Sequence, residues 1–343
     1  MTASIHQLGD KRAPSLDPMI ALTAADMNAV NAVILDRMQS KVALIPELAG
    51  HLIAGGGKRM RPMLTLASAA LLDYPGARHH KLAAAVEFIH TATLLHDDVV
   101  DESALRRGRR TANALFGNAA SVLVGDFVYS RAFQMMVGVG RIRVLEVLAD
   151  ATNVIAEGEV LQLMNMHDPD VSVDDYLRVI RFKTAKLFEA AARLGAVLAG
   201  RPELEEGLAA YGRHVGTAFQ LIDDVLDYSG DLGKNLGDDL AEGKPTLPLI
   251  YTMRCGSPEQ AGLVRKAVAE GGRGDFSRVL EAIHACGALD YARAAAHKEV
   301  EIAERAIQSL EASDYKQSLL ELASFAVTRE VAQSPSGSPT VGA

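Results

Sequence analysis

The sequence predicts an all-α protein built as one large helical bundle. Hydrophobic residues make up 49% of the 343 residues, aromatic residues only 5%, and tryptophan does not occur. Apolar residues recur every three or four positions in the stretches 22–42 and 290–312, as is typical of amphipathic helices. Thr23 is a candidate N-cap for the first of these helices. Alternating strand patterns with hairpin turns are hard to find.

Two further stretches, 81–96 and 112–137, are apolar on nearly all sides, which predicts helices buried in the middle of the bundle. Their length disfavours the alternative of a buried strand. Helix-breaking residues gather at 73–79, 167–172, 200–203, 229–248 and 255–258. None of these is a long linker, so we expect one domain over 20–330 between disordered segments at 1–19 and 331–343.

Composition limits the possible partners and the compartment. Lys and Arg number 35 against 43 Asp and Glu, a net charge of −8, so we expect no nucleic-acid partner. Cys255 and Cys286 match no metal or redox spacing, which indicates a reducing compartment. The first fifteen residues contain no apolar stretch typical of a secretory signal, and we find no uncharged apolar run of membrane-spanning length. We therefore expect a cytoplasmic protein without a transmembrane segment.

Two similar acidic motifs carry the candidate chemistry, LLHDDVVD at 94–101 and LIDDVLD at 221–227. On a helix, aspartates four positions apart share one face and repel each other, and apolar surroundings add to the cost of their charge. A cation must therefore compensate, and oxygen ligands without His or Cys suit Mg²⁺ bridging to phosphates. A single DDxxD motif is as often a solvated surface patch, but two copies in apolar helices favour a functional site. The six acidic residues are Asp97, Asp98, Asp101, Asp223, Asp224 and Asp227.

Basic residues that could bind phosphate accompany both motifs. Lys58 and Arg61 follow three glycines, whose backbone N–H groups can approach an anion, but Leu52 and Arg59 exclude a P-loop. Further candidates along the chain are Arg106, Arg107, Lys183, Thr184, Gln220, Lys234 and Lys244. Each alone is more often a solvated side chain, whereas their joint placement around two acidic helices favours a diphosphate site.

These motifs occur in the order and spacing of the trans-isoprenyl diphosphate synthase family, which the chain resembles over 20–330. The segments that carry the resemblance are GGGKRMRP, HTATLLHDDVVDESALRRG, AEGEVLQL, FKTAKLF and FQLIDDVLDY…GKNLGDDLAEGKPTLP. The form of the first acidic motif is most similar to the long-chain bacterial branch, which makes octaprenyl and decaprenyl diphosphates for quinone side chains. The resemblance implies an isoprenoid synthase-type bundle with a central substrate cavity.

The resemblance also implies roles for individual residues. Three Mg²⁺ ions, for which Mn²⁺ can substitute, would be held by Asp97, Asp101, Asp223 and Asp227. The allylic diphosphate would be surrounded by Arg106, Lys183, Thr184, Gln220, Lys234 and Lys244. Isopentenyl diphosphate would be held by Lys58, Arg61, His90 and Arg107. The residues expected to be catalytic are Asp97, Asp98, Asp101, Lys183, Thr184, Gln220, Asp223 and Asp224. His90 lies seven residues, or two helical turns, before Asp97 and therefore shares its helix face. Without this match to the motif, His90 would be interpreted as a hydrogen-bonded core histidine.

Product length is expected to depend on the helix that carries the first motif. The growing chain would extend from the diphosphate past Thr93 and Ala92, with Ile89 deeper still. Short-chain family members place large aromatic side chains at this level, so these small residues imply an open tunnel. Met135 or Met136 would form its floor, because flexible side chains can fill or clear space, and we expect about eight to ten isoprene units.

The implied partners are isopentenyl diphosphate, an allylic primer of farnesyl or geranylgeranyl type, and a second copy of the chain that pairs through 112–137. Two alternatives remain. A class I terpene cyclase would share the first motif but carries an Asn/Ser/Glu metal motif on the second helix, where this chain has aspartates. A non-catalytic subunit of a heteromeric synthase usually lacks one acidic motif, and this chain has both.

Overall fold

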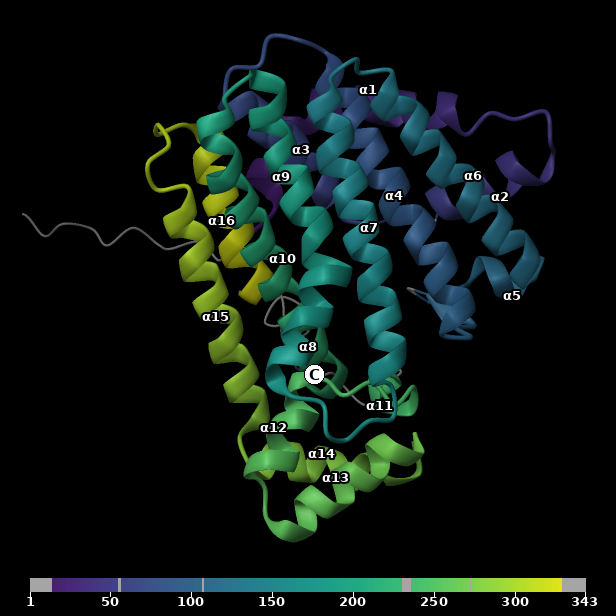
Figure 1. The fold of residues 1–343 in the computed structure, drawn as a ribbon, viewed down its shortest axis with the longest axis vertical. Helices are drawn as coiled ribbons and strands as arrows, with labels where there is room; N and C mark the ends of the chain where they lie inside the picture. Colours follow the sequence, from purple (N-terminus) through teal and green to yellow (C-terminus); the bar gives the residue numbers. More distant parts are fainter. Residues whose placement is uncertain (1–13, 55–56, 107, 230–235, 272, 329–343) are drawn as a thin grey trace, which may run out of the picture.

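The computed structural model describes residues 14–54, 57–106, 108–229, 236–271 and 273–328, which are almost entirely helical (Figure 1). The helices are α1 (Asp17–Arg37), α2 (Leu44–Ala54), α3 (Met60–Leu71), α4 (Arg78–Val100), α5 (Ala112–Phe116), α6 (Asn118–Val137), α7 (Ile142–Asn165), α8 (Val173–Ile180), α9 (Lys186–Ala199), α10 (Pro202–Ser229), α11 (Asp238–Ala241), α12 (Leu247–Cys255), α13 (Pro258–Glu270), α14 (Phe276–Ala285), α15 (Ala288–Ala306) and α16 (Asp314–Thr328). The remaining elements are a π-helical turn η1 (Arg181–Ala185), a 3₁₀ turn η2 (Arg273–Asp275) and the strands β1 (Leu105–Arg106) and β2 (Arg109–Arg110). The all-α prediction is confirmed.

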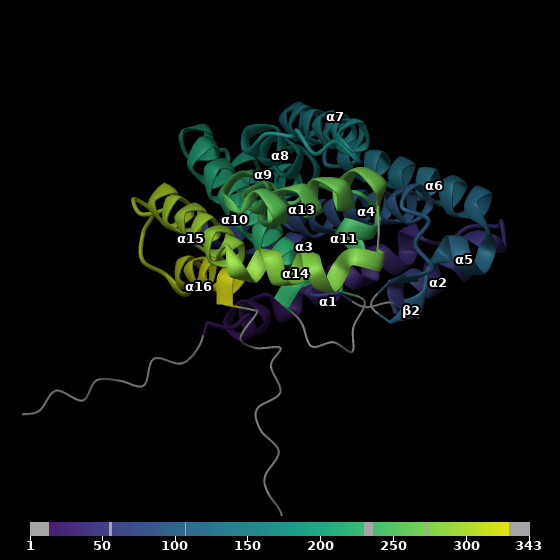
Figure 2. The same cartoon turned by 90° about the horizontal axis from the view of Figure 1, so that it is seen from below.

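The long helices lie side by side, and α13 and α14 cross one end of the bundle (Figure 2). At the centre, α10 packs against α9 and α15, α4 packs against α6, and α3 contacts both α4 and α9. The apolar stretch 81–96 lies within α4, where Ala83, Ala84 and Ala85 are fully buried, so helices approach this segment closely. The stretch 112–137 forms two helices, α5 and α6, separated at Gly117 with a φ of 86°.

The first helix begins earlier than the sequence analysis placed it. It starts at Asp17, inside the segment 1–19, because Pro18 fits the first turn of a helix and the Met19 side chain is buried. Thr23 is therefore not an N-cap. Its hydroxyl donates a hydrogen bond to the carbonyl of Met19 at 2.7 Å, within the helix.

By length and composition alone, α1 is the one helix among the described residues that could cross a membrane. It contains no uncharged apolar run of membrane-spanning length, because Asp26 interrupts the apolar stretch. In the structure α1 packs against α3, α4 and α16.

A short β-hairpin follows α4, which the sequence did not predict. Leu105 lies opposite Arg110 and Arg106 opposite Arg109 in antiparallel register. Strands of two residues are too short to show an alternating pattern. The hairpin brings arginines next to the acidic end of α4.

Candidate active site

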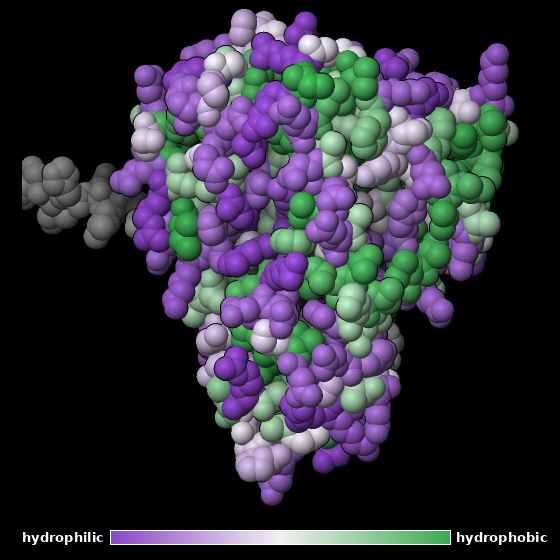
Figure 3. All heavy atoms as spheres, in the orientation of Figure 1, coloured by the Kyte–Doolittle hydropathy of each residue, from purple (hydrophilic) through white to green (hydrophobic). Residues whose placement is uncertain are grey.

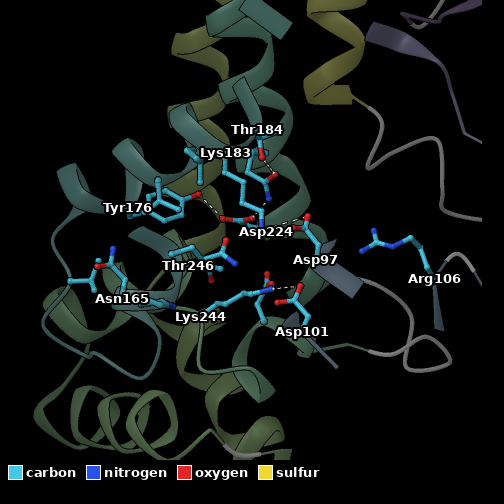
Figure 4. A pocket seen from close by; sticks show the side chains of 17 residues that line it. Asp97, Asp101, Arg106, Asn165, Tyr176, Lys183, Thr184, Asp224, Lys244 and Thr246 are labelled. Atoms are coloured by element: carbon cyan, nitrogen blue, oxygen red, sulfur yellow. Dashed lines mark hydrogen bonds and ion pairs between the residues drawn. The ribbon is translucent and has the colours of Figure 1, made fainter. Parts of the chain in front are cut away.

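Two neighbouring cavities open at the ends of α4 and α10, with volumes of about 220 Å³ and about 800 Å³. Five residues line both cavities: Asp97, Arg106, Lys183, Thr184 and Gln220. Figure 4 shows the aspartates of α4 on one side of the smaller cavity, with Asp224 and Tyr176 facing them. Residues of both acidic helices therefore line the same cavity.

The first acidic motif ends α4 and is paired with cations. Asp101 is the C-cap residue, and its N–H donates to the carbonyl of Asp97 at 2.8 Å, which keeps both residues within one turn. The carboxylate of Asp101 accepts a hydrogen bond from Nζ of Lys244 at 3.1 Å. Asp98 is 4% exposed and accepts one from Nε of Arg106 at 2.7 Å. The motif is thus held between a lysine and an arginine.

In the second motif, two adjacent aspartates have different surroundings. Both carboxylate oxygens of Asp224 are engaged, by the hydroxyl of Tyr176 at 2.5 Å and by the amide of Gln220 at 2.8 Å. The hydroxyl of Thr184 donates in turn to Gln220 at 2.9 Å. Asp223 lines the larger cavity instead. The structure therefore brings three expected site residues, Thr184, Gln220 and Asp224, together with Tyr176 in one hydrogen-bonded group.

Asp227, which we expected to bind metal, belongs to α10, and its side chain lies at the N-terminus of α11. Its carboxylate accepts hydrogen bonds from the backbone N–H groups of Gly237, Asp238 and Asp239 at 3.2, 3.3 and 3.2 Å. It does not line either cavity described above. In this arrangement the Asp227 side chain anchors the segment that leads to Lys244.

The π-helical turn η1 carries Lys183 and Thr184. Nζ of Lys183 lies 2.6 Å from a carboxylate oxygen of Glu159 and 3.8 Å from one of Asp97. Helix α7 can approach this turn because residue 158 is glycine: a Cβ there would lie 2.6 Å from the backbone nitrogen of Lys183. The small residue thus places Glu159 beside the lysine.

The larger cavity contains the other expected diphosphate site. Lys58, Arg61 and His90 all line it, as does Asp98. Nζ of Lys58 lies 4.8 Å from the ring centre of Phe325, and the guanidinium of Arg61 lies 4.3 Å from that of Phe188. Aromatic faces thus support both cations at the cavity wall. Arg107 and Lys234, expected at the two diphosphate sites, lie outside the described residues.

Of the residues expected to control product length, Thr93 lines the larger cavity. Ala92, Ile89, Met135 and Met136 are buried, and none of them lines the two cavities described above.

Burial makes the acidic groups of this region difficult to ionise, and neighbouring carboxylates add to the effect. The pKa is raised for Asp97, Asp98, Glu159, Asp224, Asp227 and Asp239, to about 7 for Glu159 and Asp224 and to about 6 for Asp227. Burial lowers the pKa of Lys244, but the carboxylates of Asp101, Asp239 and Glu242 more than offset this, so its pKa is raised. A cluster of carboxylates that the neighbouring lysines do not fully compensate fits Mg²⁺, which favours their ionised form.

Several residues of the site were missed by the sequence analysis. Tyr176, Asp239 and Thr246 line the smaller cavity without having been assigned a role. Glu159 lies in the motif AEGEVLQL, which contributed to the resemblance but to no predicted function. The available signal was Glu159 itself, the acidic residue directly after Gly158 in that motif. Nothing local distinguishes Tyr176 from a core tyrosine.

The chain matches the family model "Polyprenyl synthetase" over residues 42–285. It is 56% identical over 321 residues to the octaprenyl diphosphate synthase of Escherichia coli (strain K12), covering 92% of this chain and 99% of that protein. A solved polyprenyl synthase from Caulobacter crescentus CB15, complexed with calcium and isoprenyl diphosphate, is 50% identical with a TM-score of 0.90, covering 94% and 100% of the two chains. A decaprenyl diphosphate synthase structure from Rhodobacter capsulatus is 47% identical with a TM-score of 0.89, covering 92% and 99%.

An all-α bundle with two facing aspartate motifs and lysines between them defines a diphosphate-binding enzyme of the isoprenoid synthase fold. The chain belongs to the polyprenyl synthetase family, and its activity is that of a prenyltransferase.

Proposed function

We infer that the chain is a long-chain all-trans polyprenyl diphosphate synthase, which adds isopentenyl diphosphate units head-to-tail to an allylic diphosphate. The observation that carries this conclusion is that Asp97 and Lys183 line both neighbouring cavities, the smaller of which contains Asp224 and the larger Lys58 and Arg61. One region thus has groups for two diphosphates, as a condensation of two substrates requires. Two relatives, at 56% and 47% identity, are named for octaprenyl and decaprenyl products, which supports a quinone side chain of about eight to ten units.

We assign Mg²⁺ to Asp97, Asp101 and Asp223, with Asp227 as a further candidate, and propose three ions. Bound Mg²⁺ supplies positive charge that stabilises the departing pyrophosphate. Asp224 differs from the other aspartates because its oxygens are already hydrogen-bonded by Tyr176 and Gln220, which favours an orienting role.

The protein groups around the allylic diphosphate would act mainly through charge. Lys183, Lys244 and Arg106 contribute cations that stabilise negative charge as the allylic C–O bond ionises. Thr184 and Gln220 orient the same group. The double bond of isopentenyl diphosphate, held by Lys58, Arg61 and His90, then attacks the allylic cation. Loss of a proton, which the released pyrophosphate can accept, restores an allylic diphosphate one unit longer.

Product length would be set along α4. Thr93 supports this proposal because it lines the larger cavity one turn before Asp97. Ala92, Ile89 and Met135 would border the path of the longer chain, and its passage requires the helices around them to separate.

We further propose one catalytic domain over 20–330, a cytoplasmic location, a farnesyl- or geranylgeranyl-type primer, and a homodimer formed through 112–137. Exposed apolar side chains on α6 support the dimer, and Figure 3 shows hydrophobic surface over this part of the molecule.

An assay of the purified chain with radiolabelled isopentenyl diphosphate, an allylic primer and Mg²⁺ separates the possible functions. A synthase lengthens the primer and retains the diphosphate. A terpene cyclase would release a hydrocarbon or alcohol without incorporating label. A non-catalytic subunit would give no product at all. Either of the last two results would contradict the proposal.

A further inference from the structure

Three side chains with metal-binding atoms lie together between α1 and α4, away from both cavities. Nε2 of His80 is 2.7 Å from Oδ1 of Asp26, and Nε2 of His79 is 3.5 Å from the same oxygen. One ligand atom from each of the three residues lies within 4.8 Å of the others. The two histidines begin α4, whereas Asp26 is in the middle of α1, so the fold brings them together from distant parts of the chain.

The cluster is held in place yet open to solvent. The side chains of His79, His80 and Asp26 are 12%, 21% and 33% exposed. The Tyr74 ring meets the His79 ring edge-on at 5.7 Å, and the two imidazoles lie 4.1 Å apart. Partial burial therefore fixes the rings, while enough surface remains for an ion to enter.

The protonation state of His79 also suits a metal ion. Burial, followed by the neighbouring His80, lowers the pKa of His79, so its imidazole is neutral near pH 7. Neutral imidazole is the form that binds metal. The Asp26 carboxylate beside the two rings supplies a charged third ligand.

We propose that Asp26, His79 and His80 form a binding site for a divalent transition-metal ion, for which Zn²⁺ is the natural probe. Zinc bonds of about 2.0–2.2 Å in a tetrahedron place ligand atoms about 3.3 Å apart. The observed separations of 2.7 and 3.5 Å lie on either side of that value. Water would complete the tetrahedron. Imidazole ligands distinguish this site from the all-oxygen aspartate site, which suits Mg²⁺.

A bound ion would tie α1 to α4. This matters for the substrate region because Ile34 and the C-cap residue Met38, at the C-terminal end of α1, line the larger cavity. An ion at Asp26 would therefore stabilise the position of the helix that forms part of the cavity wall. We expect Zn²⁺ to raise the melting temperature of the protein even in saturating Mg²⁺.

The site can be tested with Co²⁺, added to the full-length, chelator-treated protein in excess Mg²⁺. Tetrahedral Co²⁺ absorbs visible light more strongly than the octahedral ion expected at an aspartate site. We expect one strongly absorbing equivalent per chain, displaced by Zn²⁺. The His80→Asn and His79→Asn variants should bind it at least about tenfold more weakly, since loss of a ligand costs more than loss of an outer partner.

His96→Asn is the matched control, because His96 lies 3.4 Å from the single carboxylate of Asp126 and should leave binding unchanged. Asp26→Asn removes the charged ligand but retains a hydrogen-bonding partner for His80. This variant therefore tests metal binding by the carboxylate even if the histidine variants fold poorly. Circular dichroism and prenyltransferase turnover verify that each variant is folded. Wild-type absorption of the octahedral kind alone, or unchanged Co²⁺ affinity in the Asp26→Asn and His80→Asn variants, would show that the cluster is only a hydrogen-bonded link.

Discussion

Asp97 lies where both cavities meet, and burial raises its pKa. Asp97→Ala should lower turnover by roughly a thousandfold, because it removes a proposed ligand of the Mg²⁺ whose positive charge would stabilise the departing pyrophosphate. The melting temperature measured without Mg²⁺ should stay equal or rise, since the variant has one buried carboxylate fewer. Steady-state kinetics and thermal melts provide both values.

Asp126→Ala is the control for this variant, because its side chain is 64% exposed on α6 and should affect neither quantity. Near-normal turnover of Asp97→Ala in Mg²⁺ would refute the assignment of Asp97 as a metal ligand.

Tyr176 lines the smaller cavity and donates a hydrogen bond to Asp224, the neighbour of the proposed Mg²⁺ ligand Asp223. Tyr176→Phe removes the hydroxyl that engages one carboxylate oxygen, which should raise the Mg²⁺ concentration required for half-maximal turnover by about 10- to 100-fold. Tyr211→Phe is the matched control: its buried hydroxyl donates to the carbonyl of Leu319 at 2.6 Å, so this variant should lose stability without a change in Mg²⁺ dependence. Equal Mg²⁺ dependence in the two variants would mean that Tyr176 is a structural residue alone.

Most of the residues that the sequence predicted for the site belong to local motifs, and many of them line the two cavities. Lys183, Thr184 and Gln220 were each found within a motif, and the structure brings them together. Tyr176 and Glu159 could not be assigned, because their roles depend on which side chain lies opposite them after α8 and α7 have packed.

Close packing of α7 against the η1 turn depends on a single glycine. Gly158→Ala would place a Cβ 2.6 Å from the backbone nitrogen of Lys183, so we expect a loss of about 1–3 kcal/mol in unfolding free energy and lower turnover as the lysine shifts. Gly262→Ala, in helix α13 with open space around the added Cβ, should instead gain about 0.5–1 kcal/mol. Denaturant unfolding compares the two. Similar effects of both substitutions would contradict the packing argument.

Helices were predictable as elements, whereas their irregularities were not. The apolar stretch 81–96 identified the core of α4, because burial on all sides leaves a continuous apolar run. The π-helical turn η1 changes the hydrogen-bond pattern without changing the composition, so the sequence contained no signal for it. The start of α1 at Asp17 was missed because Thr23 resembles a cap, although its hydroxyl bonds within the helix.

The surface of the molecule exposes large apolar side chains, and their contact with water is unfavourable unless another chain covers them. Leu123 on α6 is 67% exposed and Met164 on α7 is 73% exposed. We expect a homodimer that covers the α6 surface, and Leu123→Glu should shift it toward monomer by burying a charge in the interface. Light scattering at micromolar concentration measures this mass. Leu35→Glu, at an exposed position on α1, should leave the mass unchanged. A stable, active wild-type monomer would defeat the prediction.

The fold class followed from composition and helical periodicity over the whole chain, since the bundle buries the faces that the pattern marks. The shape of the larger cavity could not be predicted from composition and periodicity. Its wall combines α1, α3, α4 and α10, and the relative positions of these helices depend on contacts between segments far apart in the sequence.

The length of the wild-type product tests the proposed function most directly. The purified protein is incubated with radiolabelled isopentenyl diphosphate, farnesyl diphosphate and Mg²⁺, and the dephosphorylated alcohols are separated by chromatography. We expect about eight to ten isoprene units, as in the octaprenyl and decaprenyl relatives. Ala92→Phe, analysed in parallel with Ala269→Phe at an exposed position of α13, should shorten the product to about three or four units by placing a ring in the chain's path. A wild-type product that stops at three or four units, or no elongation of the primer, would contradict a long-chain synthase.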